Sequence, residues 1–167
     1  MGSGKTTLGL ALAHAASLPF IDLDDYIEER AGMSITEIFR TCGEEKFRSL
    51  ERRALEEVSR RESDGLIVAC GGGTPCREGN MELMNDCGLT VWLDTSLPVY
   101  MRRLSVARMK RPLIAALNDD ELRQFIADKL AERQCHYAKA AARFDSTLLE
   151  TPQEVAHSVK QFITEFL

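Results

Sequence analysis

The sequence has few residues that could stabilise the fold through disulfides or bound metal ions. Its five cysteines are an odd number and include no C-x-x-C pair, and its three histidines stand apart from one another. These spacings argue against a zinc site and against a disulfide framework, so we expect reduced, mostly buried thiols in a cytoplasmic protein. No repeat, low-complexity tract or linker interrupts the chain, and we expect residues 1–167 to form one domain.

Long apolar runs and an excess of positive charge are also missing. No stretch approaches the roughly 20 apolar residues of a membrane span. Since the glycine-rich segment follows Met1 directly, we expect no signal peptide. The formal net charge of -5 argues against a protein that binds nucleic acid by general phosphate neutralisation. We therefore expect small-molecule partners, with no nucleic acid and no membrane. Residues 102–111 are nevertheless locally basic, so an anion can be bound there.

Apolar positions recur with helical and strand periods in turn along the chain. Helical patterns fall at residues 5–16, 24–30, 34–40, 44–61, 97–104, 119–133 and from 152 to the end. Strand patterns fall at 19–23, 66–70, 89–93 and 143–148. This alternation predicts a three-layer α/β/α fold with a parallel sheet.

The first residues form a phosphate-binding pattern. Gly4-Lys5-Thr6 matches the end of G-x-x-x-x-G-K-[ST], in which backbone N–H groups surround a phosphate at a helix N-terminus. Lys5 is expected to bridge the outer phosphates of a nucleotide, and the Thr6 hydroxyl to bind Mg²⁺. The residues expected to hold the phosphates are Gly2, Ser3, Gly4, Lys5, Thr6 and Thr7.

The phosphate-binding pattern is incomplete at its start. Its first glycine would fall two places before Met1, and the strand that normally delivers such a loop is absent. That strand lies in the middle of sheets of this kind, so its loss would leave buried backbone groups unpaired at about 1–3 kcal/mol each. We therefore expect Met1 to be an internal methionine of a longer protein, which intact-mass measurement on the natural protein would check.

Two carboxylates follow the first predicted strand. Strand alternation would point Asp22 and Asp24 the same way, into the crevice at the carboxyl ends of the strands. One of them can hold a water on Mg²⁺ while the other accepts a hydrogen bond from a substrate hydroxyl. Taken alone, the pair fits a solvated turn or a helix N-cap at least as well.

Three further motifs give this pair its context. Arg48 and Glu51 lie one helical turn apart, Gly71-Gly72-Gly73 follows a buried strand, and Arg111-Pro112-Leu113-Ile114 lies in a basic loop. With the phosphate loop and the aspartates, their order and spacing resemble shikimate kinase over essentially the whole chain. The resemblance implies a P-loop kinase fold with a mobile lid. It also implies ATP-dependent phosphorylation of the 3-hydroxyl of shikimate, on the route to chorismate and aromatic amino acids, by an enzyme that needs Mg²⁺ and works as a monomer.

The resemblance also implies roles for single residues on the metal and acceptor side. Asp22 matches the aspartate that holds Mg²⁺ through a bound water, beside the Thr6 ligand. Asp24 matches the aspartate that binds the acceptor hydroxyls and takes the transferring proton. Arg48 matches the arginine that pairs with the shikimate carboxylate, and Glu51 orients it. The shikimate-binding region would then span about 24–61.

Other roles implied by the resemblance fall later in the chain. Gly71, Gly72 and Gly73 contact the substrate through their backbone. Arg111 matches a catalytic lid arginine that also contacts the nucleotide, in a lid at about 107–119, and Arg103 contacts the adenine side. Arg133 matches a second carboxylate-binding arginine. Two departures stand beside these matches: Cys135 replaces a usual proline near Arg133, and Thr74 replaces a common alanine.

Alternatives remain on the sequence alone. Another small-molecule P-loop kinase, similar to gluconate kinase, would share the phosphate loop but would not need the paired arginines. A GTPase is disfavoured because no N-K-x-D guanine-reading motif occurs. An inactive nucleotide-binding module would follow if the chain truly starts at Met1.

Overall fold

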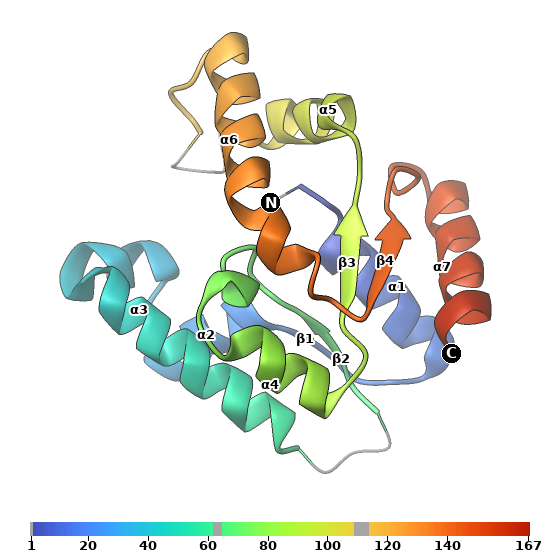
Figure 1. Ribbon diagram of the computed structural model, residues 1–167, viewed down its shortest axis with the longest axis horizontal. Helices are drawn as coiled ribbons and strands as arrows, with labels where there is room; N and C mark the ends of the chain where they lie inside the picture. Colours follow the sequence, from blue (N-terminus) through green and yellow to red (C-terminus); the bar gives the residue numbers. More distant parts are fainter. Residues whose placement is uncertain (1, 62–64, 109–113) are drawn as a thin grey trace.

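Helices and strands alternate along the chain in the computed structural model, which describes residues 2–61, 65–108 and 114–167 (Figure 1). The helices are α1 (Lys5–Ala16), α2 (Leu23–Ala31), α3 (Ile35–Ser59), α4 (Asn80–Cys87), α5 (Leu97–Ala107), α6 (Asp119–Tyr137) and α7 (Pro152–Phe166). The strands are β1 (Phe20–Asp22), β2 (Ile67–Ala69), β3 (Val91–Asp94) and β4 (Ala142–Asp145), and a short 3₁₀ helix, η1, spans Thr74–Cys76. The alternation predicted from the sequence is confirmed.

The sheet layer consists of two parallel pairs of strands. β1 pairs with β2, with Ile21 opposite Val68, and β3 pairs with β4, with Leu93 opposite Phe144. Among the described residues no pairing joins β2 to β3, and a cavity of about 800 Å³ is lined by both strands. The break lies in the middle of the layer, where the sequence predicts that a strand is missing.

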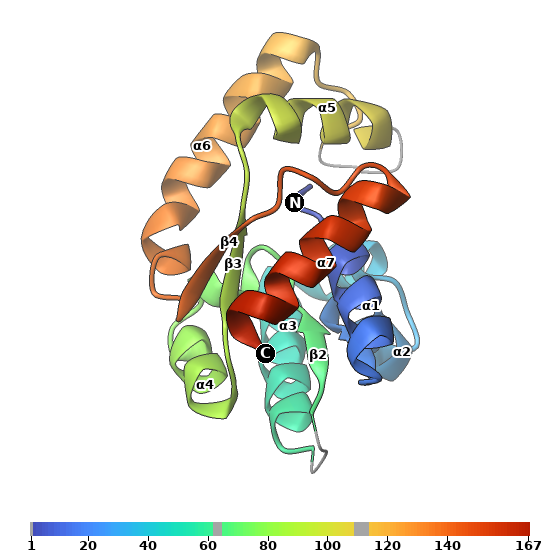
Figure 2. The same cartoon turned by 90° about the vertical axis from the view of Figure 1, so that its right-hand side faces the viewer.

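Helices cover both faces of this layer, as a three-layer fold requires. On one face α1 packs against α7, and the two lie side by side in Figure 2. Their core contains Leu8, Phe144 and Phe162. On the other face α2, α3 and α4 pack around a second core, with Leu23 and Leu55 at its centre. α5 and α6 pack on each other around a third core and stand beyond the sheet, above it in both views.

α3 carries the motif that contains Arg48. The sequence predicts two helices here. The structure has a single element, α3, with a break at Gly43, whose φ of 79° and ψ of 173° lie outside the helical region. Ser34 and Glu37 form a capping box that fixes the start of the first part. The second part buries Phe47 and Glu51, and the guanidinium of the adjacent Arg48 lies beside Gly73, in the turn after β2.

Three expectations about the fold are wrong. α4 has no counterpart among the predicted helices, because only two of its residues, Asn80 and Met81, are buried and the apolar stripe is too short to detect. α6 continues past Arg133 to Tyr137. The cysteines are not mostly buried, since Cys42, Cys87 and Cys135 are exposed and Cys70 and Cys76 are half-buried. None of the helices described is long and apolar enough to cross a membrane.

Candidate active site

The phosphate loop has the backbone that its sequence predicts. Gly2 and Gly4 adopt left-handed conformations, with φ of 75° and 90°, and Gly4 is the N-cap of α1. A Cβ atom on Gly4 would lie 2.4 Å from Leu149 Cδ1, so a side chain there would be strained by the backbone conformation and would also have to displace Leu149. The loop therefore leads into the N-terminus of α1, where backbone N–H groups and the helix dipole favour an anion.

A hydrogen bond joins the phosphate loop to the first strand. The Thr6 hydroxyl donates to Asp22 Oδ2 at 2.8 Å, and Asp22 Oδ1 accepts the backbone N–H of Asp24 at 3.2 Å. Asp22 is thus the N-cap of α2, and Asp24 lies in the first turn of that helix. The expectation that both aspartates extend from one strand is wrong, because the strand ends at Asp22. The helical turn nevertheless keeps the two carboxylates close enough for Asp22 to raise the pKa of Asp24.

Asp24 lies at the centre of the charged groups. Burial is the main cause that raises the pKa of its carboxyl above the usual value, and the negative charges of Asp22 and Glu51 add to it, whereas Lys5 lowers it. A Cβ atom on Gly71 would lie 3.0 Å from Asp24 Oδ1. The carboxylate therefore lies against the glycine turn, and glycine at position 71 leaves the space that it needs.

Arg48 is held in place by two carboxylates of its own helix. Nη1 donates to Glu51 at 2.9 Å, and Nε and Nη2 donate to Glu44 Oε1 at 3.2 and 3.1 Å. The guanidinium also lies over the Phe47 ring, 5.0 Å from its centroid. A Cβ atom on Gly73 would lie 3.1 Å from Nη1 and 3.3 Å from Nη2, so the glycine leaves the Nη1–Nη2 edge uncovered. That edge is the part of a guanidinium that binds a carboxylate through two parallel hydrogen bonds.

Glu51 is buried, with 1% of its surface exposed, and has two donors. Arg48 is one of them, and the Thr74 hydroxyl is the other, 2.6 Å from Glu51 Oε1. Thr74 is fully buried, its backbone N–H donates to the Gly71 carbonyl, and its own carbonyl accepts from Asn80 Nδ2. Thr74 and Asn80 are absent from the predicted site residues; a polar residue directly after three glycines was the signal for Thr74.

The end of α6 brings Tyr137, and Arg133 beside it, close to the glycine turn. The Tyr137 hydroxyl donates to the Gly72 carbonyl at 2.6 Å. Burial raises the pKa of this hydroxyl above its usual value, and the nearby Arg133 guanidinium partly offsets the rise. Burial also raises the pKa of the Cys76 thiol, and both Arg133 and Arg48 oppose that shift. The two arginines predicted to bind a carboxylate are therefore both near Cys76. Exposed Cys135 does not disturb this arrangement, because α6 remains helical through it.

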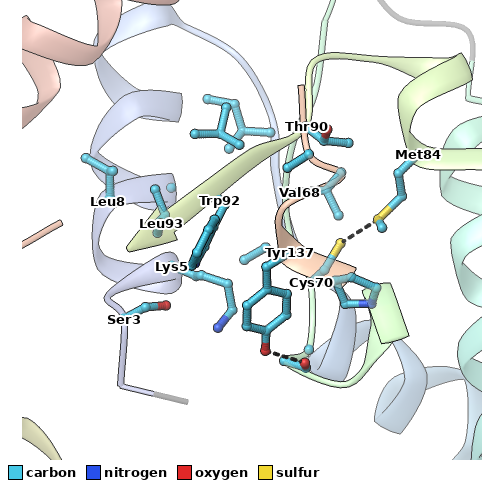
Figure 3. A pocket seen from close by; sticks show the side chains of 18 of the residues that line it. Ser3, Lys5, Leu8, Val68, Cys70, Met84, Thr90, Trp92, Leu93 and Tyr137 are labelled. Carbon is cyan, nitrogen blue, oxygen red and sulfur yellow. Dashed lines mark hydrogen bonds between the residues drawn. The ribbon is translucent and has the colours of Figure 1, made fainter. Parts of the chain in front are cut away.

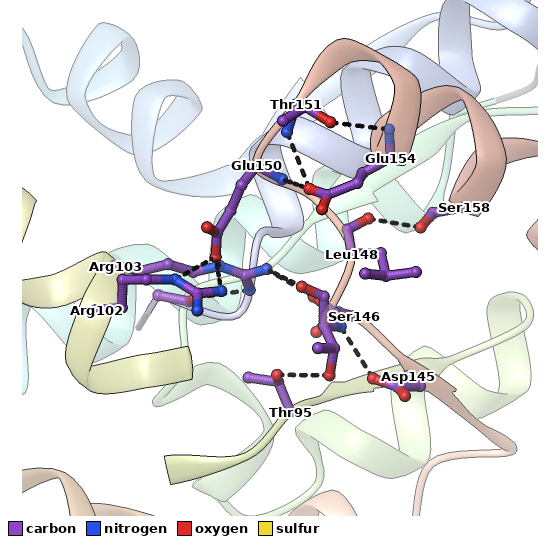
Figure 4. A network of polar contacts seen from close by, with 12 residues as sticks. Thr95, Arg102, Arg103, Asp145, Ser146, Leu148, Glu150, Thr151, Glu154 and Ser158 are labelled. Atoms are coloured by element: carbon purple, nitrogen blue, oxygen red, sulfur yellow. Dashed lines mark hydrogen bonds and ion pairs between the residues drawn. The ribbon is translucent and has the colours of Figure 1, made fainter. Parts of the chain in front are cut away.

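Arg103 connects the phosphate loop to the end of β4 (Figure 4). Its guanidinium donates to the carbonyls of Gly2, Ser146 and Thr147 at 3.3, 2.8 and 3.0 Å. Arg102 and Arg103 both pair with Glu150 in the loop before α7. These contacts place Arg103 between the phosphate loop and the residues after β4; its contact with the nucleotide itself stays a prediction.

The residues predicted to bind Mg²⁺ fit that ion. In the described ranges no three His, Cys, Asp or Glu residues gather into a metal cage. Mg²⁺ does not need one, because it is commonly held by one or two side-chain oxygens, several waters and substrate phosphates. The Thr6 hydroxyl and the Asp22 carboxylate supply such oxygens at the phosphate loop. Arg111, the predicted lid arginine, lies outside the described residues.

The fold and the site define a class of protein. A glycine-rich loop precedes α1, and an aspartate lies beside it. A separate cluster of acidic and basic residues lies at the ends of neighbouring strands. Together these features define a P-loop kinase with an α/β/α fold. A family model of shikimate kinase matches residues 1–164. The chain belongs to the shikimate kinase family.

Individual relatives are similar over nearly their whole length. A shikimate kinase from Phocaeicola vulgatus is 48% identical, and the match covers 95% of this chain and 90% of that protein. One from Bacteroides thetaiotaomicron is 44% identical over 96% and 91% of the two chains. Among solved structures, the shikimate kinase from Bacteroides thetaiotaomicron has a TM-score of 0.93 at 42% identity, covering 99% of this chain and 93% of that one. The shikimate kinase from Acinetobacter baumannii, solved in complex with shikimate, has a TM-score of 0.82 at 29% identity, covering 100% and 90%.

Proposed function

We propose that this protein transfers a phosphoryl group from ATP to the 3-hydroxyl of shikimate, giving shikimate 3-phosphate and ADP for the synthesis of chorismate and aromatic amino acids. The observation that carries the proposal is the continuity of the site. Thr6 reaches Asp22, Asp22 caps the helix of Asp24, and the Asp24 carboxylate lies against Gly71. These contacts support a phosphate site and an acceptor site that lie side by side, as transfer requires.

We assign the phosphates to the loop from Gly2 to Thr7, with Lys5 neutralising the outer ones. Mg²⁺, held by Thr6 and through Asp22, would supply charge neutralisation at the transferred phosphoryl group. Arg103 supports the loop from the adenine side. Arg111 adds positive charge from the lid, and closure of the lid excludes water, so that ATP is not hydrolysed.

We assign the acceptor to the second half of the site. Asp24 accepts the proton of the 3-hydroxyl, and its raised pKa makes it a stronger base than an exposed aspartate. Arg48, fixed by Glu51, and Arg133 bind the carboxylate of shikimate, since planar guanidinium groups pair with carboxylates through two hydrogen bonds. Gly71, Gly72 and Gly73 allow the substrate to approach the backbone.

We further propose that residues 1–167 act as one domain and one monomer in the cytoplasm, on small molecules rather than on nucleic acid or membranes. The acceptor region is 24–61 and the lid is 107–119. All five cysteines are free thiols, which supports a reducing compartment.

The experiment is ADP release coupled to a spectrophotometric readout, with shikimate, gluconate and other polyols as acceptors. We expect turnover with shikimate only. Turnover with gluconate would favour a gluconate-kinase-like enzyme, and ATP binding without turnover on any acceptor would favour an inactive nucleotide-binding module. Either result would overturn the proposed function.

A further inference from the structure

Glu51 is a buried carboxylate with a different donor on each of its oxygens. Arg48 Nη1 donates to Oε2 at 2.9 Å, and the Thr74 hydroxyl donates to Oε1 at 2.6 Å. Taking a carboxylate out of water is costly unless hydrogen bonds and an opposite charge replace the water. Arg48 supplies the opposite charge, and Thr74 supplies a neutral donor on the other oxygen.

The Thr74 side chain acts inside the protein. Thr74 has 0% of its surface exposed, and a threonine hydroxyl has a single proton to donate, which is directed at Glu51. The hydroxyl therefore does not reach an acceptor molecule. Its effect on the site has to pass through the Glu51 carboxylate.

The position of the Thr74 hydroxyl is set by the fold. The backbone N–H of Thr74 donates to the Gly71 carbonyl at 3.1 Å, and the Thr74 carbonyl accepts from Asn80 Nδ2 at 2.9 Å. Asn80 is itself buried, at the start of α4. The glycine turn is also held from α6, because the Tyr137 hydroxyl donates to the Gly72 carbonyl (Figure 3). Thr74 thus offers Glu51 a donor that is in place before any substrate binds.

The bond to Thr74 also fixes the rotation of the Glu51 carboxylate. A Cβ atom on Gly71 would lie 3.0 Å from Asp24 Oδ1 and 3.5 Å from Glu51 Oε1. Thr74 Oγ1 would lie 3.1 Å from the same Cβ atom, so the three groups border one glycine. Because the two oxygens of a carboxylate belong to one planar group, the bond that holds Oε1 sets the direction in which Oε2 meets Arg48.

Of the two carboxylates that hold Arg48, Glu51 is the one that can fix its orientation. The Glu44 side chain is 61% exposed, and that of Glu51 is 2% exposed. Exposed ion pairs hold their side chains weakly, because water competes for both partners. The Nη1–Nη2 edge of Arg48 lies beside Gly73, where it is left uncovered. The direction of that edge therefore depends chiefly on the buried contact with Glu51.

We infer that the Thr74 hydroxyl is a positioning group for the acceptor carboxylate. It holds the rotation of the Glu51 carboxylate, and Glu51 in turn directs the two free donors of Arg48 at the substrate. The inference rests on the proposed function, since it takes Arg48 as the residue that binds the carboxylate of shikimate. Two parallel hydrogen bonds need both donors in line with both oxygens, so a small turn of the guanidinium weakens the pair.

Removal of the hydroxyl tests this role in coupled ADP release. Thr74→Val keeps the branched shape, and Thr74→Ala removes the hydroxyl without placing a methyl group against Glu51. We expect both to raise the KM for shikimate, Thr74→Val about tenfold, the order of one hydrogen bond to a charged group. The KM for ATP should be unchanged and kcat should stay within about twofold. Thr74→Ser keeps the hydroxyl and should have the shikimate KM of the parent.

Ser158→Ala is the matched control for the loss of a buried hydroxyl. Ser158 has 2% of its surface exposed, and its hydroxyl donates from α7 to the Leu148 carbonyl at 2.7 Å. Thr74→Val and Ser158→Ala should both lower the urea midpoint, and only Thr74→Val should raise the shikimate KM. An equal rise in both variants would trace the effect to lost stability and overturn the inference.

A double-mutant cycle tests the route through Arg48. If the hydroxyl acts by directing the guanidinium, its loss has little left to disturb once lysine stands at position 48. We expect Thr74→Val to raise the shikimate KM by less than about threefold in Arg48→Lys, against about tenfold in the parent. The same tenfold rise in both backgrounds would contradict the inference, because the hydroxyl would then act independently of Arg48.

Failure of the inference and failure of the proposed function give different results. If the parent chain binds ATP but has no turnover with shikimate, the proposed function fails and the inference fails with it. If the parent turns over, and Thr74→Val and Thr74→Ala lower the urea midpoint with an unchanged shikimate KM, Thr74 is merely structural and only the inference is overturned. A raised KM that persists in Thr74→Ser would also overturn it, because the hydroxyl would then not be the cause.

Discussion

The Arg48→Lys variant keeps the positive charge at this position but removes the paired N–H donors of the guanidinium group. A guanidinium has five N–H donors, and Arg48 uses three of them, one on Glu51 and two on Glu44. The remaining two are one on Nη1 and one on Nη2, along the edge that Gly73 leaves uncovered. Those two donors suit the two oxygens of a carboxylate, and a lysine ammonium at the same position cannot offer both while it also pairs with Glu51.

The expected loss follows from that count. Removing one hydrogen bond between charged groups costs about 1.5–3 kcal/mol, which is about 10- to 150-fold in an equilibrium constant. We expect Arg48→Lys to raise the KM for shikimate by this factor. The carboxylate is remote from the reacting hydroxyl and is bound equally in the ground and transition states, so kcat should change by less than about threefold.

Arg52→Lys is the matched control, because Arg52 lies one turn further along α3 and its partners are Glu56, Asn80 and the Gly79 carbonyl. ADP release measured against shikimate and ATP concentration should show an unchanged shikimate KM for this variant. An unchanged shikimate KM in Arg48→Lys, or an equal rise in both variants, would refute the role of Arg48 as the carboxylate-binding arginine.

Four further outcomes follow from the contacts of the site. Asp24→Asn should lower kcat by about 10²–10⁴-fold with little change in ATP affinity, and weakened ATP binding would instead place Asp24 in the metal site. Because burial raises the pKa of the Asp24 acid, its ionisation disfavours folding. Stability should therefore fall from about pH 4 upward through the raised pKa, and urea midpoints should show a smaller fall in Asp24→Asn. Asp22→Asn keeps an equally good N-cap for α2 but should raise the Mg²⁺ needed for half-maximal activity about 10- to 100-fold; an unchanged requirement would remove Asp22 from the metal site. Arg103→Met leaves three carbonyls without their donor and should raise the KM for ATP about tenfold with an unchanged shikimate KM, whereas a change in the shikimate KM alone would contradict its place on the nucleotide side.

The sequence predicted the elements whose signal is local. Gly4 before a helical period, the start of the last helix at Pro152 and the break at Gly43 each depend on a few neighbouring residues, and each is confirmed. The order of helices and strands was accessible for the same reason. α4 was not, because a helix of eight residues with little apolar surface has no period long enough to detect.

The contacts within the site were less accessible, because they join segments far apart in the chain. The pairing of Thr74 with Glu51 spans 23 residues, and that of Tyr137 with Gly72 spans 65. A motif indicates that Arg48 and Glu51 share a helix face. Only the fold shows that the Thr74 hydroxyl, after the glycine turn, donates a second hydrogen bond to the Glu51 carboxylate. Asp24 shows the opposite case: its proximity to Asp22 was expected for the wrong reason, since a helix start and not a strand provides it.

The two halves of the sheet share one site although no ladder joins them in the part of the chain that the structure describes. Thr6 ties the phosphate loop to β1, Arg103 ties the same loop to the end of β4, and Tyr137 ties α6 to the glycine turn after β2. These side-chain hydrogen bonds lie at the carboxyl ends of the strands, and Tyr137 and Gly72 also line the cavity between β2 and β3 (Figure 3). In the described residues the two strand pairs are therefore linked at the site by side chains rather than by a ladder.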